Sequence, residues 1–277
     1  MLRHLRTLKR FGSKTHGLHF MKTIGHSRTG KIYKTRDGVT GELYTCKILP
    51  QGLQARREVC ILKKLKGERI QSFRRVTGND IIHILTDYIP GRDLFDELTF
   101  RTAEGSLSLE IKMTFIREII ACVSQVHANG FAHLDIKLEN FIVDKSNHLS
   151  VKIIDFGGSH PLPVGTRKLQ ILTGTFGYTS PELCQGCYHS NSDVWSLGVC
   201  IWSILHGSMP FHHKDFEPNT CHKEEAKGRF VFPTTLHVRQ TASLPGDPLD
   251  LFTAIFKPVA AERISLTELK QHSWITG

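Results

Sequence analysis

The spacing of apolar residues changes once along this chain of 277 residues, at the helix-breaking pair Pro90-Gly91. Before this pair the chain reads as short β-type runs with one helical stretch, 54–66, that carries Glu58 on its apolar face. The predicted strands cover residues 20–24, 31–35, 41–48, 72–77 and 81–88. We therefore expect a small five-stranded β lobe with one helix over residues 20–89.

After the pair, apolar residues follow helical spacing. Ile111, Phe115, Ile119 and Val123 repeat every four residues, and further helices are predicted at 193–207, 248–256 and 265–275. We expect a larger, mainly helical lobe over residues 90–275. The fold class is thus α+β with two lobes, preceded by a tail at 1–19.

The positive charge of the chain belongs to its N-terminal part. Lys and Arg number 36 against 26 Asp and Glu, and residues 1–36 hold ten bases and no acid, so the rest balances at 26 against 26. The tail, 1–19, is predicted to be a solvated segment. The alternatives are an arm that contacts nucleic acid, a membrane or another acidic surface, or an organelle presequence.

Cysteine usage and hydropathy bear on the compartment. Seven cysteines, an odd number, are scattered through the chain, and the tail lacks the apolar core of a secretory leader. No apolar run approaches the length of about 20 residues that spans a bilayer. We expect a soluble, intracellular protein without a transmembrane segment, whether cytoplasmic or nuclear.

Several motifs occur in a fixed order. The glycine-containing turn at 25–32 is weak evidence by itself, since such turns usually only close a hairpin. It is followed by Lys47 in a strand, Glu58 on a helix, His-Leu-Asp-Ile-Lys-Leu-Glu-Asn at 133–140, Asp-Phe-Gly at 155–157, Ser-Pro-Glu at 180–182 and Ser-Asp-Val-Trp-Ser-Leu-Gly at 192–198. In sequence and separation, from about residue 20 to 275, this set resembles the signature motifs of the eukaryotic protein kinases.

The resemblance implies an enzyme that uses ATP and Mg²⁺ to phosphorylate protein hydroxyls. It implies that Asp135 accepts the proton of the substrate hydroxyl, that Lys137 neutralises the moving phosphoryl group, and that Asn140 and Asp155 bind Mg²⁺. The implied nucleotide-binding residues are Ile24, Gly25, His26, Ser27, Arg28, Thr29, Gly30, Lys31, Ile32, Thr45, Lys47, Glu58, Asp87, Ile89 and Ile142.

The same resemblance assigns supporting roles. Thr86 would guard the back of the adenine site, Asp193 would tie down the catalytic loop, and Glu182 would pair with Arg263. For Ile24, Ile32 and Ile142, plain core packing is the alternative.

Substrate preference is implied by three features. Lys137 and the Gly174-Thr175 pair resemble the serine/threonine branch rather than the tyrosine kinases. Asp93 and Glu139 occupy positions where some relatives carry carboxylates that face arginines upstream of the acceptor, which suggests a basic substrate motif. Asp93 equally suits a ribose contact or a solvated loop.

The chain departs from the family pattern at positions that bear on control. Ser27 stands where a glycine is usual and is expected to weaken nucleotide binding. Leu134 replaces the arginine that receives an activation-loop phosphate, and Ile171 replaces its usual acceptor. We expect activity without activation-loop phosphorylation, with Leu134 and Ile171 packed together, although Thr166 and Thr173 can still be modified.

Two other functions remain open at this stage. A pseudokinase that acts as a scaffold or allosteric partner is compatible with Ser27 and Leu134, but Lys47, Asp135, Asn140 and Asp155 are all present. A small-molecule phosphotransferase is disfavoured by Ser180-Pro181-Glu182 and Arg263, which resemble peptide-docking kinases. A kinase domain with a short basic tail also resembles the compact kinases of large DNA viruses. Ser180 stands where the family pattern has alanine before Pro181-Glu182, and we expect this change to have little consequence.

Overall fold

The computed structural model describes residues 17–27, 30–78, 80–146, 149–211 and 248–277. The chain divides into two compact units. The first contains the residues up to Lys64 together with Gln71–Ile89, and the second contains Leu65–Ile70 and Pro90–Gly277. Most of the basic tail and two predicted nucleotide-binding residues, Arg28 and Thr29, lie outside the described residues.

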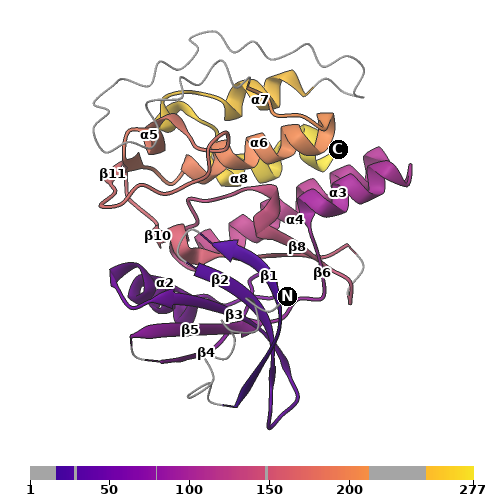
Figure 1. The fold of residues 1–277 in the computed structure, drawn as a ribbon. Coiled ribbons are helices and arrows are strands. Elements are labelled where there is room, and N and C mark those ends of the chain that lie inside the picture. The colour runs from indigo at the N-terminus through magenta and orange to yellow at the C-terminus, as the bar shows by residue number, and fades with distance from the viewer. Residues whose placement is uncertain (1–16, 28–29, 79, 147–148, 212–247) are drawn as a thin grey trace. The chain divides into compact units, whose positions relative to one another are not determined.

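The first unit is a five-stranded antiparallel sheet with strand order β1-β2-β3-β5-β4 (Figure 1). Buried and more exposed side chains alternate along the second half of β2, whereas β5 is buried without interruption over residues 83–86. Cys46, Ile84 and Leu85 form part of the core. Helix α2 contacts β4 through a face that includes buried Ile61 and Leu62. The elements are β1 (Leu18–Ser27), β2 (Gly30–Asp37), β3 (Leu43–Pro50), α2 (Leu53–Lys64), β4 (Phe73–Thr77) and β5 (Ile81–Asp87).

Strand register groups the predicted nucleotide-binding residues of this sheet. Ile32 lies opposite Lys47, and Thr45 lies opposite Thr86. Directly opposed residues of an antiparallel pair point to the same side of the sheet. Because Thr45 and Lys47 are two residues apart on β3, all four side chains share one face.

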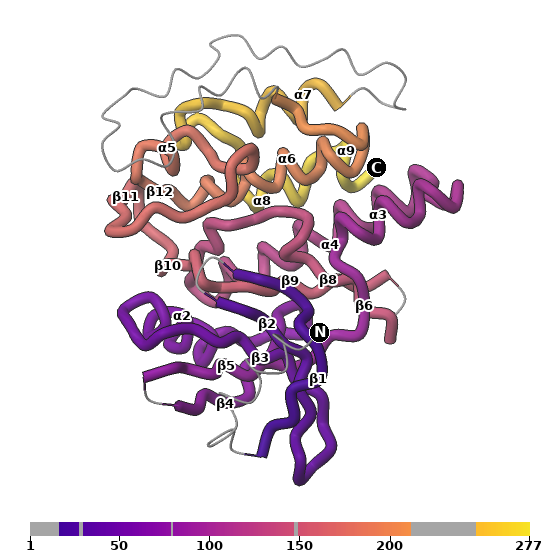
Figure 2. The backbone as a smooth tube through the Cα atoms, in the orientation of Figure 1, coloured from indigo at the N-terminus to yellow at the C-terminus, as the bar shows by residue number. Residues whose placement is uncertain are grey.

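The second unit is mainly helical. Its long helix α4 contacts β9 as well as α6 and α8, and its course through the unit can be followed in Figure 2. Almost every residue of helix α6 is buried, including the polar residues Ser192, Asp193 and Ser196. The helices are α3 (Leu94–Ala103), α4 (Leu109–Ala128), α5 (Pro181–Cys184), α6 (Ser192–His206), α7 (Leu249–Ile255), α8 (Leu266–Gln271) and α9 (Ser273–Thr276).

Short strands and 3₁₀ turns of the second unit hold the motifs predicted to be catalytic. Strands β6, β8 and β9 form one sheet, while β7 pairs with β10 and β11 pairs with β12. Their bounds are β6 (Gly91–Asp93), β7 (Phe131–Ala132), η1 (Leu138–Asn140), β8 (Phe141–Asp144), β9 (Val151–Ile153), η2 (Phe156–Gly158), β10 (His160–Pro161), β11 (Arg167–Lys168), β12 (Cys187–Tyr188) and η4 (Ala260–Glu262). The loop from β7 to η1 contains Asp135 and Lys137.

The predicted mixed fold with a five-stranded β lobe and a larger helical lobe is confirmed, whereas three of its boundaries are wrong. Strand β1 begins at Leu18, which is buried, so residues 18–19 belong to the sheet rather than to the tail. The single helix predicted at 265–275 is two helices, because His272 has extended backbone and its side chain caps α9.

The third boundary concerns residues 65–70, which we assigned to the first lobe but which cluster with the second unit. Side chains of α4 hold them there. The Oε1 of Gln125 accepts a hydrogen bond from the backbone N–H of Arg69 at 2.8 Å. The side chain of Asn129 accepts from the backbone N–H of Lys66 and donates to its carbonyl oxygen, both at 2.9 Å. Arg69 also forms an ion pair with Glu118 at 2.6 Å. The spacing of apolar residues along the sequence cannot predict polar contacts of this kind, so it could not assign residues 65–70 to the second unit.

Candidate active site

A buried ion pair lies in the first unit. The Nζ of Lys47 on β3 donates to the Oε1 of Glu58 on α2 at 2.7 Å, and 11% and 3% of the two side chains are exposed. A lysine is a flexible point charge, so this partner fixes where its ammonium group lies. The two side chains are therefore paired in this structure.

The other predicted nucleotide-binding residues that the structure describes in this unit lie on the four neighbouring strands β1, β2, β3 and β5 and on the segment that follows β5. Ile24 on β1 is 40% exposed, so it is not a core residue. Asp87 at the end of β5 is engaged by the guanidinium of Arg74, whereas Ile89 is buried. Gly25, His26 and Lys31 lie in the β1–β2 hairpin, and Ile142 lies on β8 in the second unit.

Ser27 and Gly30 close the β1–β2 hairpin. The backbone N–H of Gly30 donates to the Oγ of Ser27 at 3.1 Å. A Cβ atom at Gly30 would lie 1.7 Å from the carbonyl oxygen of Ile48, so no other residue fits at this position. The serine that replaces a glycine at position 27 thus has a structural part in the turn.

The catalytic loop of the second unit fixes Asp135 from two sides. The Nδ2 of Asn140 donates to the backbone carbonyl of Asp135 at 2.7 Å. The Oγ1 of Thr175, forty residues further along the chain, donates to the Oδ1 of Asp135 at 2.6 Å. Lys137, two residues after Asp135, has extended backbone and is half-buried. Asp135 and Asn140, which the motif places five residues apart, are thus bonded to each other.

Asp193 holds the backbone of this loop. Its fully buried carboxylate accepts the backbone N–H groups of His133 and Leu134 at 2.7 and 2.8 Å, and the Nε2 of His127 lies 2.8 Å away. Burial alone would raise the pKa of Asp193, but the hydrogen bond and charge of His127, with His133, lower it overall. These bonds hold Leu134 at φ 62°, in the left-handed region that a side chain rarely adopts.

Asp155 begins η2 with the same left-handed backbone, φ 59°, and its Oδ1 accepts the N–H of Gly157 at 3.3 Å. Phe156 is buried against the ring of His133, with ring centroids 5.2 Å apart. Asp155 offers carboxylate oxygen, and Asn140 keeps a carbonyl oxygen because its amide nitrogen is engaged. Such hard oxygen ligands suit Mg²⁺.

Among the described ranges, no group of three or more His, Cys, Asp or Glu side chains is arranged to hold a metal ion. Mg²⁺ is commonly bound by one or two protein carboxylates with substrate phosphates and water completing its shell. The donor set of Asp155 and Asn140 fits an ion that arrives with a phosphorylated ligand.

An apolar cluster contains Leu134. Leu134 is 3% exposed and packs with Ala132, Leu183 and Tyr188. Leu162 and Leu169 also pack against this cluster, and both belong to the segment between Asp-Phe-Gly and Ser-Pro-Glu, residues 158–179, which we call the activation segment. The predicted partner, Ile171, is 49% exposed, so this part of the prediction is wrong. The segment reaches the cluster at Leu169 because β11 pairs with β12, which ends at Tyr188.

A second buried ion pair joins distant parts of this unit. Arg263 donates to both carboxylate oxygens of Glu182, at 2.9 and 3.0 Å, and also to the carbonyls of Lys257 and Asn191. Burial would raise the pKa of Glu182, but the hydrogen bonds and charge of Arg263 outweigh it and lower the pKa. Next to this pair, Ser180 is fully buried, and its hydroxyl has no hydrogen-bond partner within the described part of the chain.

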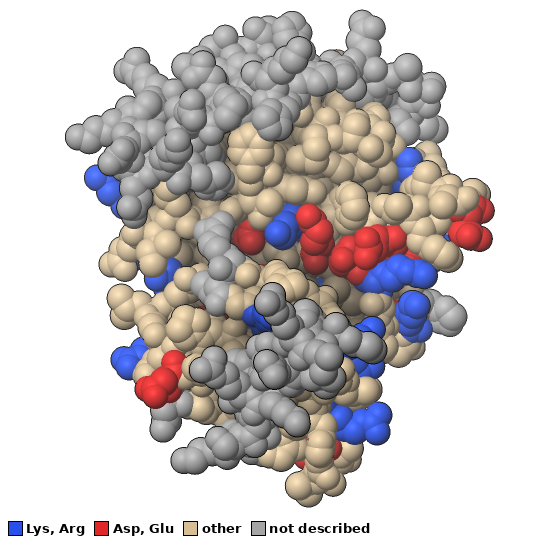
Figure 3. Space-filling view, viewed as in Figure 1, with Lys and Arg blue, Asp and Glu red and all other residues tan. Residues whose placement is uncertain are grey.

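Acidic side chains gather on one face of the second unit (Figure 3). Asp93 caps α3 by accepting the backbone N–H of Asp96 at 2.9 Å. Burial raises the pKa of the Asp93 carboxyl, and the nearby charges of Asp96 and Glu139 raise it further. Glu139, the fourth residue after Asp135, is solvent-exposed. We call Asp93, Asp96 and Glu139 the acidic patch.

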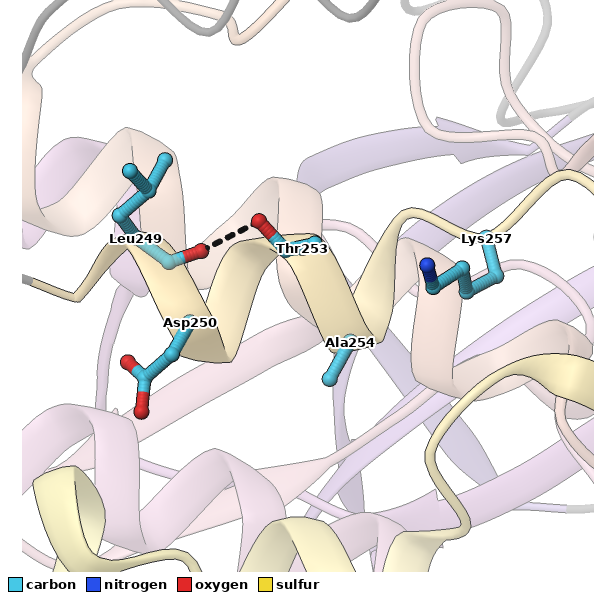
Figure 4. Close-up of a pocket in the computed structure, with 5 residues that line it drawn as sticks. All are labelled: Leu249, Asp250, Thr253, Ala254 and Lys257. Carbon is cyan, nitrogen blue, oxygen red and sulfur yellow. Dashed lines mark hydrogen bonds between the residues drawn. The ribbon is translucent and has the colours of Figure 1, made fainter.

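Two cavities of the second unit do not contain predicted site residues. One of about 610 Å³ lies along α7 and is lined by Leu249, Asp250, Thr253, Ala254 and Lys257 (Figure 4). The other, of about 380 Å³, is lined partly by the Arg69–Glu118 ion pair and Lys152. Because neither cavity contains a predicted site residue, the predicted catalytic loop remains the candidate site.

Within the described ranges, no helix is both long and apolar enough to cross a membrane.

Sequence reasoning missed three residues that shape the site. The Thr175–Asp135 bond, the contact of His127 with Asp193 and the packing of Tyr188 against Leu134 join residues far apart in the sequence. Thr175 was noted only as a mark of the serine/threonine branch. Without a second sequence to compare, no local pattern distinguishes half-buried His127 or buried Tyr188 from other residues of the same burial.

Comparison with known proteins places this geometry in context. The family model for the protein kinase domain matches residues 18–275. Similar proteins include the probable serine/threonine-protein kinase MARK-B of Dictyostelium discoideum, 31% identical over 264 residues, which cover 92% of this chain and 35% of the relative. Maternal embryonic leucine zipper kinase of Xenopus tropicalis is 30% identical over 274 residues, covering 95% and 39%.

NUAK family SNF1-like kinase 2 of Rattus norvegicus is likewise 30% identical over 271 residues, which cover 94% of this chain and 40% of the relative. The chain thus spans well under half of the length of each of these three relatives.

Proposed function

The chain belongs to the protein kinase domain family, and from this premise we propose that it transfers the γ-phosphoryl group of ATP to serine and threonine hydroxyls of proteins. The observation that carries the proposal is the position of Asp135, whose backbone is bonded by Asn140 and whose carboxylate is bonded by Thr175. A general base must be held in a fixed position if it is to meet a substrate hydroxyl.

The proposed nucleotide contacts follow from the ion pair of the first unit. Lys47, held by Glu58, would bind the α- and β-phosphate oxygens, while Ile24, Ile32 and Thr45 would contact the adenine ring. The backbone of the 25–32 hairpin would cover the phosphates, with Ser27 and Gly30 setting its turn. Asp87 and Ile89 would hydrogen-bond the base through their backbone.

The catalytic residues act on the acceptor and on the phosphoryl group. When bound with ATP, Mg²⁺ supplies positive charge that offsets the charge developing on the phosphate oxygens. Asp155 and Asn140 are the residues that would hold it. Asp135 orients the acceptor hydroxyl and takes its proton, and Lys137 stabilises the negative charge of the phosphoryl group in flight.

Phosphoamino-acid analysis tests the proposal. We would incubate the expressed chain with radiolabelled ATP, MgCl₂ and basic and acidic acceptor proteins, and then hydrolyse the products. Label on phosphoserine and phosphothreonine, absent with Asp135→Asn, supports the proposal. Label on phosphotyrosine would overturn the acceptor class. No transfer by a folded protein would favour the pseudokinase alternative, which Ser27 and Leu134 motivate.

We further propose that this activity does not need a phosphate on the activation segment. The support is the apolar cluster, in which Leu134 takes the position of the phosphate-binding arginine and against which Leu169 of the segment packs. Tyr188 adds a hydrogen bond from its hydroxyl to the carbonyl of Pro161 at 3.2 Å. Buried apolar contacts and a hydrogen bond would stabilise the ordered segment without any added charge.

Phosphatase treatment tests this independence. Protein treated with phosphatase and confirmed unmodified by mass spectrometry should retain activity within about twofold of untreated protein. A loss of activity that tracks occupancy at Thr166 or Thr173 would contradict the proposal. Treating a kinase known to need its activation-loop phosphate in parallel checks that the phosphatase is effective.

The acidic patch supports a proposed preference for basic substrates. Asp93 and Glu139 carry adjacent negative charge on the unit that holds Asp135, and an arginine side chain can bond two carboxylates at once. A peptide with arginine three residues before the serine should therefore be phosphorylated with kcat/KM at least about tenfold above its alanine counterpart. Equal rates for the two peptides would remove this preference.

A further inference from the structure

We propose that one corner of the first unit's sheet binds the surface of a membrane that contains anionic phospholipids. The side chains of Lys22, Lys34 and Arg36 would contact the lipid phosphates, and the apolar side chain of Val39 would enter the headgroup layer. We call these four residues the basic corner. The inference goes beyond the proposed phosphoryl transfer and does not depend on it.

Strand register gathers the three bases on one face of the sheet. Lys22 on β1 lies directly opposite Lys34 on β2, and Arg36 follows Lys34 by two residues. Opposed residues, and residues two apart on one strand, point to the same side of a sheet. The three side chains therefore leave the sheet in the same direction, from positions about 5–8 Å apart. Lys22 and Arg36 are exposed to solvent.

No acid of the described chain offsets these charges. Like charges directly opposite each other destabilise a strand pair. Within the described ranges, no Asp or Glu forms an ion pair with Lys22, Lys34 or Arg36. A cluster of bases that is kept without an acidic partner in its own fold suits an anionic ligand.

The acids of the first unit are mostly engaged elsewhere. Its described residues include eleven Lys and Arg but five Asp and Glu. Glu58, Asp37 and Asp87 are paired with Lys47, Arg75 and Arg74, and Glu42 accepts a hydrogen bond from the hydroxyl of Tyr44. The positive charge of the basic corner is therefore available to a ligand.

An exposed apolar residue lies beside the bases. Val39 follows Arg36 by three residues in the turn between β2 and β3, and it is 91% exposed. Asp37 holds this turn by accepting the backbone N–H groups of Val39 and Thr40 at 2.9 and 3.0 Å. Binding to a bilayer surface gains both from apolar area that enters it and from attraction of bases to anionic lipids.

The basic corner lies at the end of the sheet where β1 begins. The backbone N–H of Gly38 in the β2–β3 turn donates to the carbonyl of Gly17 at 2.7 Å, just before β1 (Figure 1). The hairpin proposed to cover the phosphates of ATP closes at the other end of β1, at Ser27 and Gly30. The two binding regions are thus separated along the strands.

A lipid surface fits this corner better than a nucleic acid strand. Proteins that bind single strands stack the bases on aromatic side chains. The aromatic rings of the neighbouring strands are covered, since Tyr33 is buried, Phe20 packs edge-on against it, and the ammonium group of Lys34 lies 4.0 Å from the ring centroid of Tyr88. An exposed valine contributes nothing to phosphate contacts but gains from entry into a bilayer.

Vesicle co-sedimentation tests the inference with the full chain. One set of vesicles would contain phosphatidylcholine with about 30% phosphatidylserine, and the other phosphatidylcholine alone, both in about 0.15 M NaCl. We expect partitioning to the anionic vesicles to be at least about tenfold stronger. Lys22→Gln combined with Arg36→Gln should weaken it at least about tenfold, because each base near an anionic surface contributes roughly fivefold.

The matched control removes two charges from another part of the same unit. Lys63 and Lys64 lie in the last turn of α2, which contacts β4, and β4 is the edge strand opposite β1. Lys63→Gln combined with Lys64→Gln should change partitioning less than about threefold. Circular dichroism and thermal unfolding of both pairs check that each variant is folded.

Substitution of Val39 tests the apolar contact. Val39→Ser should weaken partitioning at least about threefold, and the effect should persist at about 0.5 M NaCl, where attraction between charges is screened. Val164 is 96% exposed in the activation segment, and Val164→Ser is the control that should leave partitioning unchanged.

Three results would overturn the inference. The first is equal partitioning to the two kinds of vesicle, and the second is an equal loss from the two lysine- and arginine-substituted pairs. The third is binding of a single-stranded oligonucleotide that needs Lys22 and Arg36, without binding to anionic vesicles, which would assign the basic corner to nucleic acid instead.

Discussion

The hydroxyl of Thr175 donates a 2.6 Å hydrogen bond to the Oδ1 of Asp135. The bond joins the activation segment to the catalytic loop across forty positions of sequence. Thr179 bonds back to the carbonyl of Thr175 at 2.8 Å, which helps to fix the threonine. The orientation of the proposed base therefore depends on a residue outside its own loop.

Removal of this hydroxyl should lower turnover. Thr175→Val keeps the shape of the side chain but cannot donate to Asp135, so we expect kcat to fall at least about tenfold while KM for ATP changes little. Thr175→Ser keeps the hydroxyl and should retain most of the activity. Steady-state kinetics of both variants check the prediction, and equal activity of the two would contradict it.

Truncation of Leu134 should destabilise the second unit. Leu134→Ala leaves a cavity in the cluster with Leu183 and Tyr188, at a cost of about 2–5 kcal/mol in the free energy of unfolding. Ile171→Ala, at an exposed position of the same segment, is the control and should cost about 0.5 kcal/mol or less. Urea unfolding followed by circular dichroism measures both. Similar costs for the two variants would show that the cluster does not hold the segment.

Stability should fall in acid because of two buried carboxylates. The folded-state pKa values of Asp193 and Glu182 are lowered, so both contribute stability above the unfolded-state pKa values of about 4. The contribution is lost as pH falls from about 4 through the lower folded values, because the protonated forms lose their charged partners. Urea midpoints measured from pH 7 to pH 3 check this.

The variant Arg263→Gln serves as the comparison in the pH series. It should be less stable than the wild type at pH 7, because Glu182 is left buried without its cation. Its stability should also fall less steeply below pH 4. A slope as steep as that of the wild type would exclude Glu182 as a contributor.

Substitution of Ser180 should stabilise the protein. Its buried hydroxyl has no partner among the described residues, and such a group costs about 1–3 kcal/mol. We expect Ser180→Ala to raise the free energy of unfolding by about 1 kcal/mol and Tm by about 2–4 °C. Ser192→Ala should do the opposite, because the Ser192 hydroxyl donates to Glu182 at 2.7 Å. A lower Tm for Ser180→Ala would contradict this reading.

Periodicity and motif order were sufficient for the fold and for the local parts of the site. The strands around Lys47 follow from alternation of apolar residues, and Asp135, Lys137 and Asn140 lie in one short loop whose spacing is visible in the sequence. The resemblance supplied their roles.

Long-range polar and packing contacts could not be predicted in this way. The partner of Leu134 was expected to be Ile171, because both had lost a phosphate-related side chain, yet the pairing of β11 with β12 presents Leu169 instead. The assignment of residues 65–70 failed for a related reason, since Gln125 and Asn129 act through hydrogen bonds that leave no apolar pattern.

The measurement that tests the central claim most directly compares nucleotide binding with phosphoryl transfer. We would measure binding of ATP·Mg by calorimetry and transfer to an arginine-containing serine peptide for the wild type, Asp135→Asn and Lys47→Met. The account predicts that Asp135→Asn binds nucleotide within about threefold of the wild type but loses transfer at least about 100-fold, and that Lys47→Met loses both. Undiminished transfer by Asp135→Asn, or a folded wild type that binds ATP·Mg without transferring phosphate, would contradict it.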